Sequence, residues 1–176
     1  MNLWHDVKAG PNAPELIHIV IEIPHTTRNK YELDHENGFF RLDRVLNSSL
    51  HYPADYGLIP QTLYDDGDPL DALVLIREPT FTGCVVTARP LGIFRMVDQG
   101  AADDKILAVL NNDPIYSEYK QLEDVPVKQL EEIAHFFAHY KDLERKKVKV
   151  LGWESREVAY QQIRHAQQLY QQHKAQ

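Results

Sequence analysis

The chain has 176 residues, a formal net charge of −7 and a hydrophobic fraction of 43%. This length fits a single domain over residues 1–176 that buries roughly 70% of the surface exposed by the unfolded chain. The acidic balance disfavours a nucleic-acid partner, and no apolar run approaches the ~20 residues of a membrane span, so we expect neither kind of partner.

Strand patterns dominate the first two thirds of the chain. Short apolar runs separated by Pro, Gly, Asn and Asp predict strands at residues 15–23, 30–33, 39–43, 72–77, 84–88, 91–95, 106–110 and 148–151. Many short strands favour a small β-barrel that is closed or nearly closed.

Two helical patterns follow. Pro126 fits the first turn of one helix, and Ser155 fits the N-cap of the other. The apolar positions at helical spacing are Val127, Leu130, Ile133 or Ala134, and Phe137, then Ala159, Ile163, Ala166 and Tyr170. The predicted fold class is therefore α+β, mainly β, with flanking C-terminal helices.

An acidic segment stands before the strand predicted at residue 72. Asp65-Asp66-Gly67-Asp68-Pro69-Leu70-Asp71 places four carboxylates in seven positions around a Gly and a Pro. Carboxylates this close are tolerated when some are protonated, when they point apart into water, or when a divalent ion lies between them. The segment alone leaves a metal site and a solvated Asp-Gly turn open.

A calcium loop does not fit this segment. Counted from Asp66, the sixth position is Asp71 where an EF-hand needs Gly, and the twelfth is Arg77 where it needs Glu. We therefore do not expect a calcium sensor.

Further ionic groups accompany the acidic segment. Glu22 lies inside an apolar strand, where an unpaired charge is costly. Lys30 and Glu32 are two positions apart and share a strand face. Other candidates are Asp98, Asp103, Asp104 and Lys105, with Arg44, Tyr52, Tyr56, Tyr140 and Lys141 as cations and phenol donors for phosphate oxygens. Carboxylates that hold metals, facing cations that hold an anion, suit phosphoryl transfer to water.

The same segments resemble the soluble family I inorganic pyrophosphatases in their short prokaryotic form. The resemblance covers most of residues 15–153, and its most specific motif is D-G-D-P-x-D at residues 66–71. The other matching segments are residues 21–24, 28–34, 42–46, 52–57, 98, 103–105 and 135–143. His51, which precedes Tyr-Pro, and the Gln-rich tail after Gln161 depart from the family pattern.

The resemblance implies an OB-like barrel and a specific activity. The expected reaction is magnesium-dependent hydrolysis of inorganic diphosphate to two phosphates, by direct attack of a hydroxide that bridges metal ions. Several Mg²⁺ ions are expected in each active site, and the short prokaryotic form implies a homo-oligomer, typically a hexamer.

The resemblance also implies residue roles. Asp68 is expected to be the general base, and the metal ligands to be Asp66, Asp71, Asp98 and Asp103. The residues expected to bind phosphoryl oxygens are Lys30, Arg44, Tyr56, Tyr140 and Lys141. The supporting residues are Glu22 and Glu32, which act through waters or orient cations, and Tyr52 and Lys105, which position the acids.

Two other functions remain open. A metal-buffering protein would explain the acids and leave the phosphate-binding cations unused, and an OB-type module for single-stranded nucleic acid conflicts with the net charge. His135 and His139 have the spacing of a zinc pair but lack the Glu of a His-Glu-x-x-His site, so we expect packing or interface roles. The lone cysteine, Cys84, and an N-terminus without a signal pattern predict a cytoplasmic protein.

Overall fold

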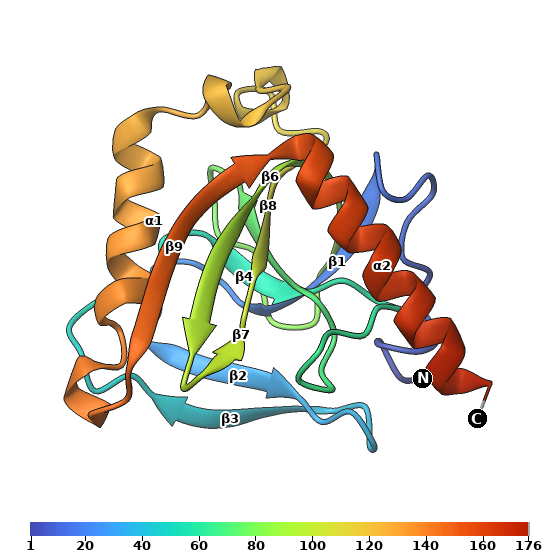
Figure 1. Ribbon diagram of the computed structural model, residues 1–176, viewed down its shortest axis with the longest axis horizontal. Coiled ribbons are helices and arrows are strands. Elements are labelled where there is room, and N and C mark those ends of the chain that lie inside the picture. The colour runs from blue at the N-terminus through green and yellow to red at the C-terminus, as the bar shows by residue number, and fades with distance from the viewer. Residues whose placement is uncertain (176) are drawn as a thin grey trace.

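Five strands close into a barrel in the computed structural model, which describes residues 1–175 (Figure 1). In order of hydrogen bonding they are β1 (Ile17–Ile23), β4 (Asp55–Leu58), β5 (Asp71–Leu75), β8 (Lys105–Leu110) and β6 (Val85–Asp98). A further pairing of β6 with β1 closes the ring. The β5–β8 pair is parallel and the other pairs are antiparallel.

Four more strands lie outside this ring. β9 (Val148–Ser155) and the short β7 (Ala101–Ala102) pair with the second half of β6. β2 (Asn29–Leu33) and β3 (Phe40–Val45) form a separate two-stranded hairpin that lies across one end of the barrel, at the bottom of Figure 1.

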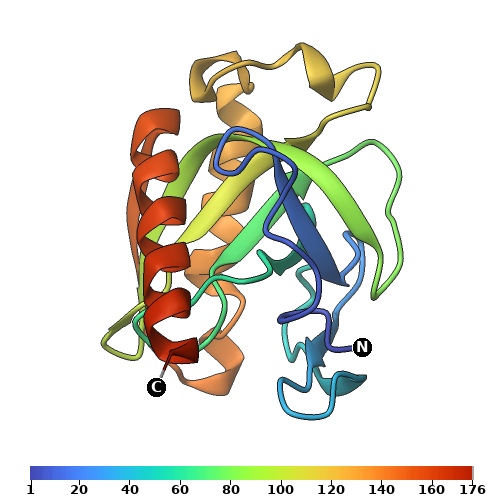
Figure 2. The same cartoon turned by 90° about the vertical axis from the view of Figure 1, so that its right-hand side faces the viewer.

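Two helices cover different sides of the barrel (Figures 1 and 2). They are α1 (Val127–His139) and α2 (Arg156–Lys174), and three short 3-10 turns are η1 (Tyr116–Glu118), η2 (Leu122–Asp124) and η3 (Asp142–Glu144). Pro126 is the N-cap of α1 and Ser155 that of α2, so both helices begin where the sequence predicts. None of the helices within residues 1–175 has the length and apolarity needed to cross a membrane.

The core has two main parts because the strands bury both of their faces. Along β5, Ala72 and Val74 face a cluster that includes Ile163 of α2, whereas Leu73 and Leu75 face a cluster under α1. Burial on both faces explains why the sequence of β5 is an unbroken apolar run rather than an alternating one. The predicted fold class, a mainly β closed barrel with C-terminal helices, is confirmed.

Two strand predictions were wrong in detail. The strands predicted at residues 84–88 and 91–95 are one strand, β6, which continues through Pro90. Its pairing with β8 shifts register between Pro90 and Gly92, and proline is tolerated at such an irregularity because a ladder hydrogen bond is already missing there.

β4 was not predicted as a strand. It is four residues long and contains Gly57, which is untypical of a strand. A Cβ at Gly57 would lie 2.0 Å from the carbonyl oxygen of Val20, so glycine is what allows β4 to approach β1.

Candidate active site

A cavity of about 600 Å³ is lined by residues of the barrel strands, the β2–β3 hairpin and the end of α1. All predicted site residues except Arg44 and Lys105 line it: Glu22, Lys30, Glu32, Tyr52, Tyr56, Asp66, Asp68, Asp71, Asp98, Asp103, Tyr140 and Lys141. The fold thus gathers acids and phosphate-binding donors from distant parts of the sequence around one space.

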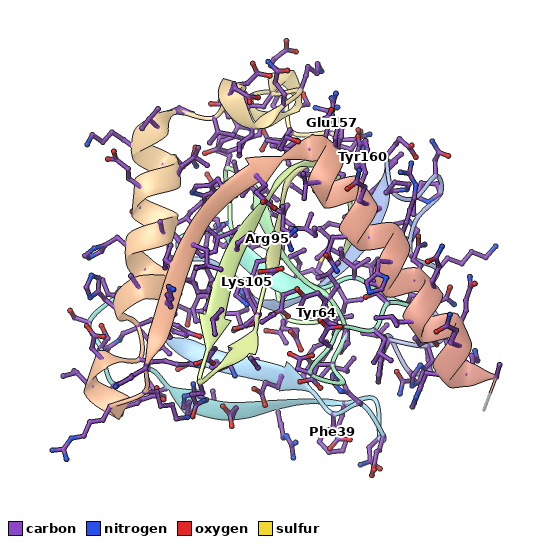
Figure 3. All side chains as sticks on the ribbon, viewed as in Figure 1. Phe39, Tyr64, Arg95, Lys105, Glu157 and Tyr160 are labelled. Atoms are coloured by element: carbon purple, nitrogen blue, oxygen red, sulfur yellow. The ribbon has the colours of Figure 1, made fainter. Side chains whose placement is uncertain are left out.

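A buried lysine, Lys105, which Figure 3 labels, organises two of the acids that line the cavity. Lys105 is only 1% exposed, and its Nζ lies 2.8 Å from Asp71 Oδ2 and 2.8 Å from Asp103 Oδ1. The parallel register of β5 and β8 pairs Asp71 directly with Lys105. Tyr56 donates its hydroxyl to the same Asp71 carboxylate. Lys105 therefore lies beneath the cavity and holds two acids together.

This ion cluster shifts the pKa values of its members in different directions. Burial raises the pKa of Asp71, even though the Lys105 ammonium opposes that rise. Burial also acts to raise the pKa of Asp103, but its ion pair with Lys105 prevails and lowers it. Burial and the negative charge of Asp71 raise the pKa of Tyr56, so its phenol stays a hydrogen-bond donor.

The acidic turn presents two carboxylates at the rim. Gly67 has a φ of +92°, which suits glycine, and the turn is closed by hydrogen bonds from Gly67 N to Tyr64 O (3.1 Å) and from Tyr64 N to Asp68 O (2.7 Å). Asp66 Oδ1 accepts the backbone N–H of Asp68 at 3.0 Å. Burial raises the pKa values of Asp66 and Asp68, with a contribution from Asp68 to Asp66 and from Asp71 to Asp68.

The cations of the cavity are paired with acids. Lys141 Nζ forms an ion pair with Asp98, and Lys30 Nζ forms one with Glu32. Tyr140, which adjoins Lys141, is 5% exposed, and burial raises the pKa of its phenol. Each of these pairs places a positive donor beside a carboxylate within reach of a ligand in the cavity.

Arg44 lies outside the lining. Its Nε donates to Glu144 Oε1 at 3.1 Å and its Nη1 to Asp43 Oδ2 at 2.6 Å. Its Nη2 is buried without a hydrogen-bond partner within the described part of the chain. The phosphate-binding role of Arg44 stays a prediction, with this free nitrogen as the available donor.

The extra acids next to the predicted ligands have different surroundings. Asp104 is buried and accepts from Tyr64 Oη at 2.5 Å and from Arg95, both labelled in Figure 3. Asp65 is exposed. Asp104 therefore links Arg95 of β6 to Tyr64, which immediately precedes the acidic segment.

Sequence reasoning missed several residues of the lining, among them Asp34, His35 and Arg41. Asp34 and His35 follow directly after the strand predicted at residues 30–33, and Arg41 lies in the strand predicted at residues 39–43. The signal that could have found His35 is the position of an ionisable residue next to the strand that carries Lys30 and Glu32.

Glu22 is a strongly perturbed acid in the cavity. It is 7% exposed, and its Oε1 accepts the backbone N–H of Leu33 at 2.8 Å. Burial raises its pKa to about 8, with smaller contributions from Asp71 and Glu32. Without metal, Glu22 is therefore protonated in the folded protein at neutral pH.

This protonation makes stability depend on pH. Between the ordinary pKa of 4.5 and the folded value of about 8, the folded protein holds a proton that the unfolded chain has released. The free energy of unfolding therefore falls as pH rises through this window and levels off above it. The Glu22→Gln side chain cannot ionise, so the variant does not share this pH dependence. In EDTA, the melting temperature of Glu22→Gln minus that of wild type is therefore expected to increase as pH is raised from about 5 to about 9. Exposed Glu123→Gln serves as the control and should follow wild type. Parallel curves for Glu22→Gln and wild type would contradict the assignment.

The donor set fits hard divalent cations. Within residues 1–175, no three His, Cys, Asp or Glu side chains are grouped tightly enough to enclose an ion, because lysine ammonium groups lie among the carboxylates. However, Asp98 Oδ1 is buried with no hydrogen-bond partner in this part of the chain. Asp98 shares the cavity with Asp66, Asp71 and Asp103. An unpaired carboxylate oxygen among oxygen-only donors matches what Mg²⁺ or Mn²⁺ binds.

Comparison with known proteins identifies the family. The family model described as inorganic pyrophosphatase matches residues 19–171. The chain is 51% identical over 171 residues to an inorganic pyrophosphatase of Haloferax volcanii, covering 97% of both chains. It is 55% identical over 141 residues to one of Nostoc sp., covering 80% of this chain and 83% of that protein. The crystal structure of the inorganic pyrophosphatase from Thermus thermophilus superposes with a TM-score of 0.94 at 42% identity, covering 97% of this chain and 99% of that one. The chain therefore belongs to the inorganic pyrophosphatase family, whose members are hydrolases of diphosphate.

Proposed function

We propose that this protein hydrolyses inorganic diphosphate to two phosphates with several Mg²⁺ ions bound. The observation that carries the proposal is the composition of the cavity lining, in which acids and cationic or phenolic donors share one space. The aspartates are Asp66, Asp68, Asp71, Asp98 and Asp103, and the donors from the hairpin and from the end of α1 are Lys30, Tyr140 and Lys141. Family membership supports the same substrate.

Asp66, Asp71, Asp98 and Asp103 would hold the ions. Bound magnesium supplies Lewis-acid polarisation of the phosphoryl oxygens and makes the attacking water more acidic. Lys105 keeps Asp71 and Asp103 close together before any ion binds, since its ammonium neutralises their mutual repulsion.

Asp68 would act as the general base. Its side chain is 65% exposed on the cavity rim, so it can meet a water that approaches the substrate. Partial desolvation of the carboxyl group in the cavity, together with the charges of Asp71 and Glu32, raises its pKa against the opposing effect of His35, which strengthens it as a proton acceptor. A positioned base of this kind contributes about 10² to 10⁴ in rate.

The lysines and tyrosines would bind the phosphoryl groups. Lys30, Tyr56, Tyr140 and Lys141 line the cavity and can donate to phosphate oxygens as negative charge moves to the departing phosphate. Arg44, which lies outside the lining, is proposed as a further donor to these oxygens. Tyr52 and Lys105 would orient the acids, while Glu22 and Glu32 would orient cations or bound waters.

Diphosphate is expected to be hydrolysed far faster than ATP when magnesium is the only divalent ion. Charged side chains dominate the lining, which suits a small, highly charged anion better than the apolar base of a nucleotide. A phosphate-release assay would compare diphosphate, ATP and a phosphomonoester, each with magnesium and with EDTA. Equal rates on diphosphate and ATP would overturn the specificity. A metal buffer or a nucleic-acid module would release no phosphate from any of the three.

Two broader properties are also proposed. We place the protein in the cytoplasm, which its one free cysteine, Cys84, supports. We further propose a homohexamer, in line with the short prokaryotic form of the family; exposed large apolar side chains such as Phe39, Leu42 and Val127 offer surface for contacts between copies.

A further inference from the structure

The general base has little to hold its side chain. The backbone of Asp68 is fixed by the acidic turn, but its carboxylate extends from the rim and is 65% exposed. Within residues 1–175, the one basic nitrogen within 4 Å of this carboxylate is Nδ1 of His35, which lies 3.5 Å from Asp68 Oδ1. His35 belongs to the turn of the β2–β3 hairpin and lines the same cavity.

The turn that carries His35 is closed by hydrogen bonds to Asp34. Asp34 Oδ1 accepts the backbone N–H groups of Glu36 at 3.2 Å and Asn37 at 2.8 Å, and Asp34 O accepts the N–H of Gly38 at 2.8 Å. These bonds fix the backbone on both sides of His35. A side chain on such a turn is preorganised relative to one on a free loop.

The N-terminal segment ties this turn to the loop that leads into Asp68. Asn2 Nδ2 donates to His35 O at 2.7 Å, and the Trp4 ring packs on the His35 ring with centroids 4.7 Å apart. Trp4 is buried, and its Nε1 donates to Thr62 O at 2.8 Å. Gln61 N in turn donates to Trp4 O at 2.9 Å. One segment therefore sets the position of the imidazole relative to the acidic loop.

We propose that His35 is a positioning residue for Asp68: its Nδ1–H donates to Asp68 Oδ1 and holds the carboxylate toward the water that attacks phosphorus. This inference rests on the proposed function. A contact of 3.5 Å is long for a hydrogen bond, and contacts to catalytic groups commonly tighten when substrate binds. Fixing the carboxylate ahead of the reaction removes rotamers that do not face the water, which favours turnover rather than substrate binding.

The test uses steady-state diphosphate hydrolysis with magnesium by His35→Ala, His35→Asn and His35→Gln. Asn places its amide N–H near the position of Nδ1, whereas the amide of Gln reaches the position of Nε2. His35→Ala is expected to lower kcat about tenfold, less than the loss of a base itself, with KM changed by less than about twofold. His35→Asn is expected to recover most of that loss and His35→Gln little of it. His165→Ala, on the exposed face of α2, is the control and should match wild type.

A double-mutant cycle separates positioning from a merely structural role. In the Asp68→Asn background, His35→Ala is expected to lower kcat no further, because there is no base left to orient. Equal kcat for wild type and His35→Ala would overturn the inference, as would equal kcat for the Asn and Gln variants or multiplicative losses in the cycle. If His35→Ala does not fold, the comparison of Asn with Gln still decides. A wild-type protein that releases no phosphate from diphosphate would instead overturn the proposed function.

Discussion

Asp68→Asn is expected to lower the turnover number for diphosphate by about 10² to 10⁴ while leaving magnesium affinity close to that of wild type. The amide has nearly the shape of the carboxylate but cannot take a proton from water. Asp68 lies at the rim, and partial desolvation in the cavity and neighbouring acids raise its pKa. Phosphate-release kinetics give the turnover number, and isothermal titration of magnesium gives the affinity.

Asp71→Asn is the matched comparison. Asp71 is held by Lys105 and Tyr56 on the cavity floor, where its charge would offset that of a bound ion. This variant is expected to lose both turnover and magnesium affinity. If Asp68→Asn lost more magnesium affinity than Asp71→Asn, the roles of base and metal ligand would be reversed.

Lys105→Met is expected to lower the free energy of unfolding by about 3 to 5 kcal/mol when no metal is present. The substitution keeps the length of the side chain but leaves Asp71 and Asp103 without the ammonium that lies 2.8 Å from each of them. Chemical denaturation in EDTA measures the loss.

Magnesium provides a second measurement on the same variant. An ion bound near Asp71 and Asp103 would replace part of the missing positive charge, so magnesium should stabilise Lys105→Met more than it stabilises wild type. Lys128→Met, at an exposed ion pair with Glu131, is the control and is expected to leave the melting curve nearly unchanged. Equal stability of Lys105→Met and wild type in EDTA would show that the buried ammonium is not required.

Local sequence signals predicted much of the fold. The helix starts at Pro126 and Ser155 were confirmed to within one residue, because the residue types that favour a helix start are visible in local sequence. Ser155 occupies the N-cap position without a side-chain cap hydrogen bond. β4 was missed because its contacts with β1 and β5, not its own four residues, make it a strand. Closure of the ring depends on the pairing of β6 with β1, which no local pattern specifies.

The sequence predicted which residues belong to the site better than it predicted the contacts among them. Clustered acids and the D-G-D-P-x-D motif indicated which residues to expect, and the cavity brings most of them together. The ion pairs of Lys105 with Asp71 and of Arg44 with Glu144 join residues 34 and 100 positions apart. Such pairs follow from strand register and from the packing of the hairpin on η3, which sequence spacing does not reveal.

The most direct test of the account is the rate of phosphate release from diphosphate by the purified wild-type protein. With magnesium, two phosphates are expected for each diphosphate consumed; EDTA should abolish release, and added magnesium should restore it. No release with magnesium, or an equal rate in EDTA, would contradict the proposal that the acidic cavity hydrolyses diphosphate with bound divalent ions.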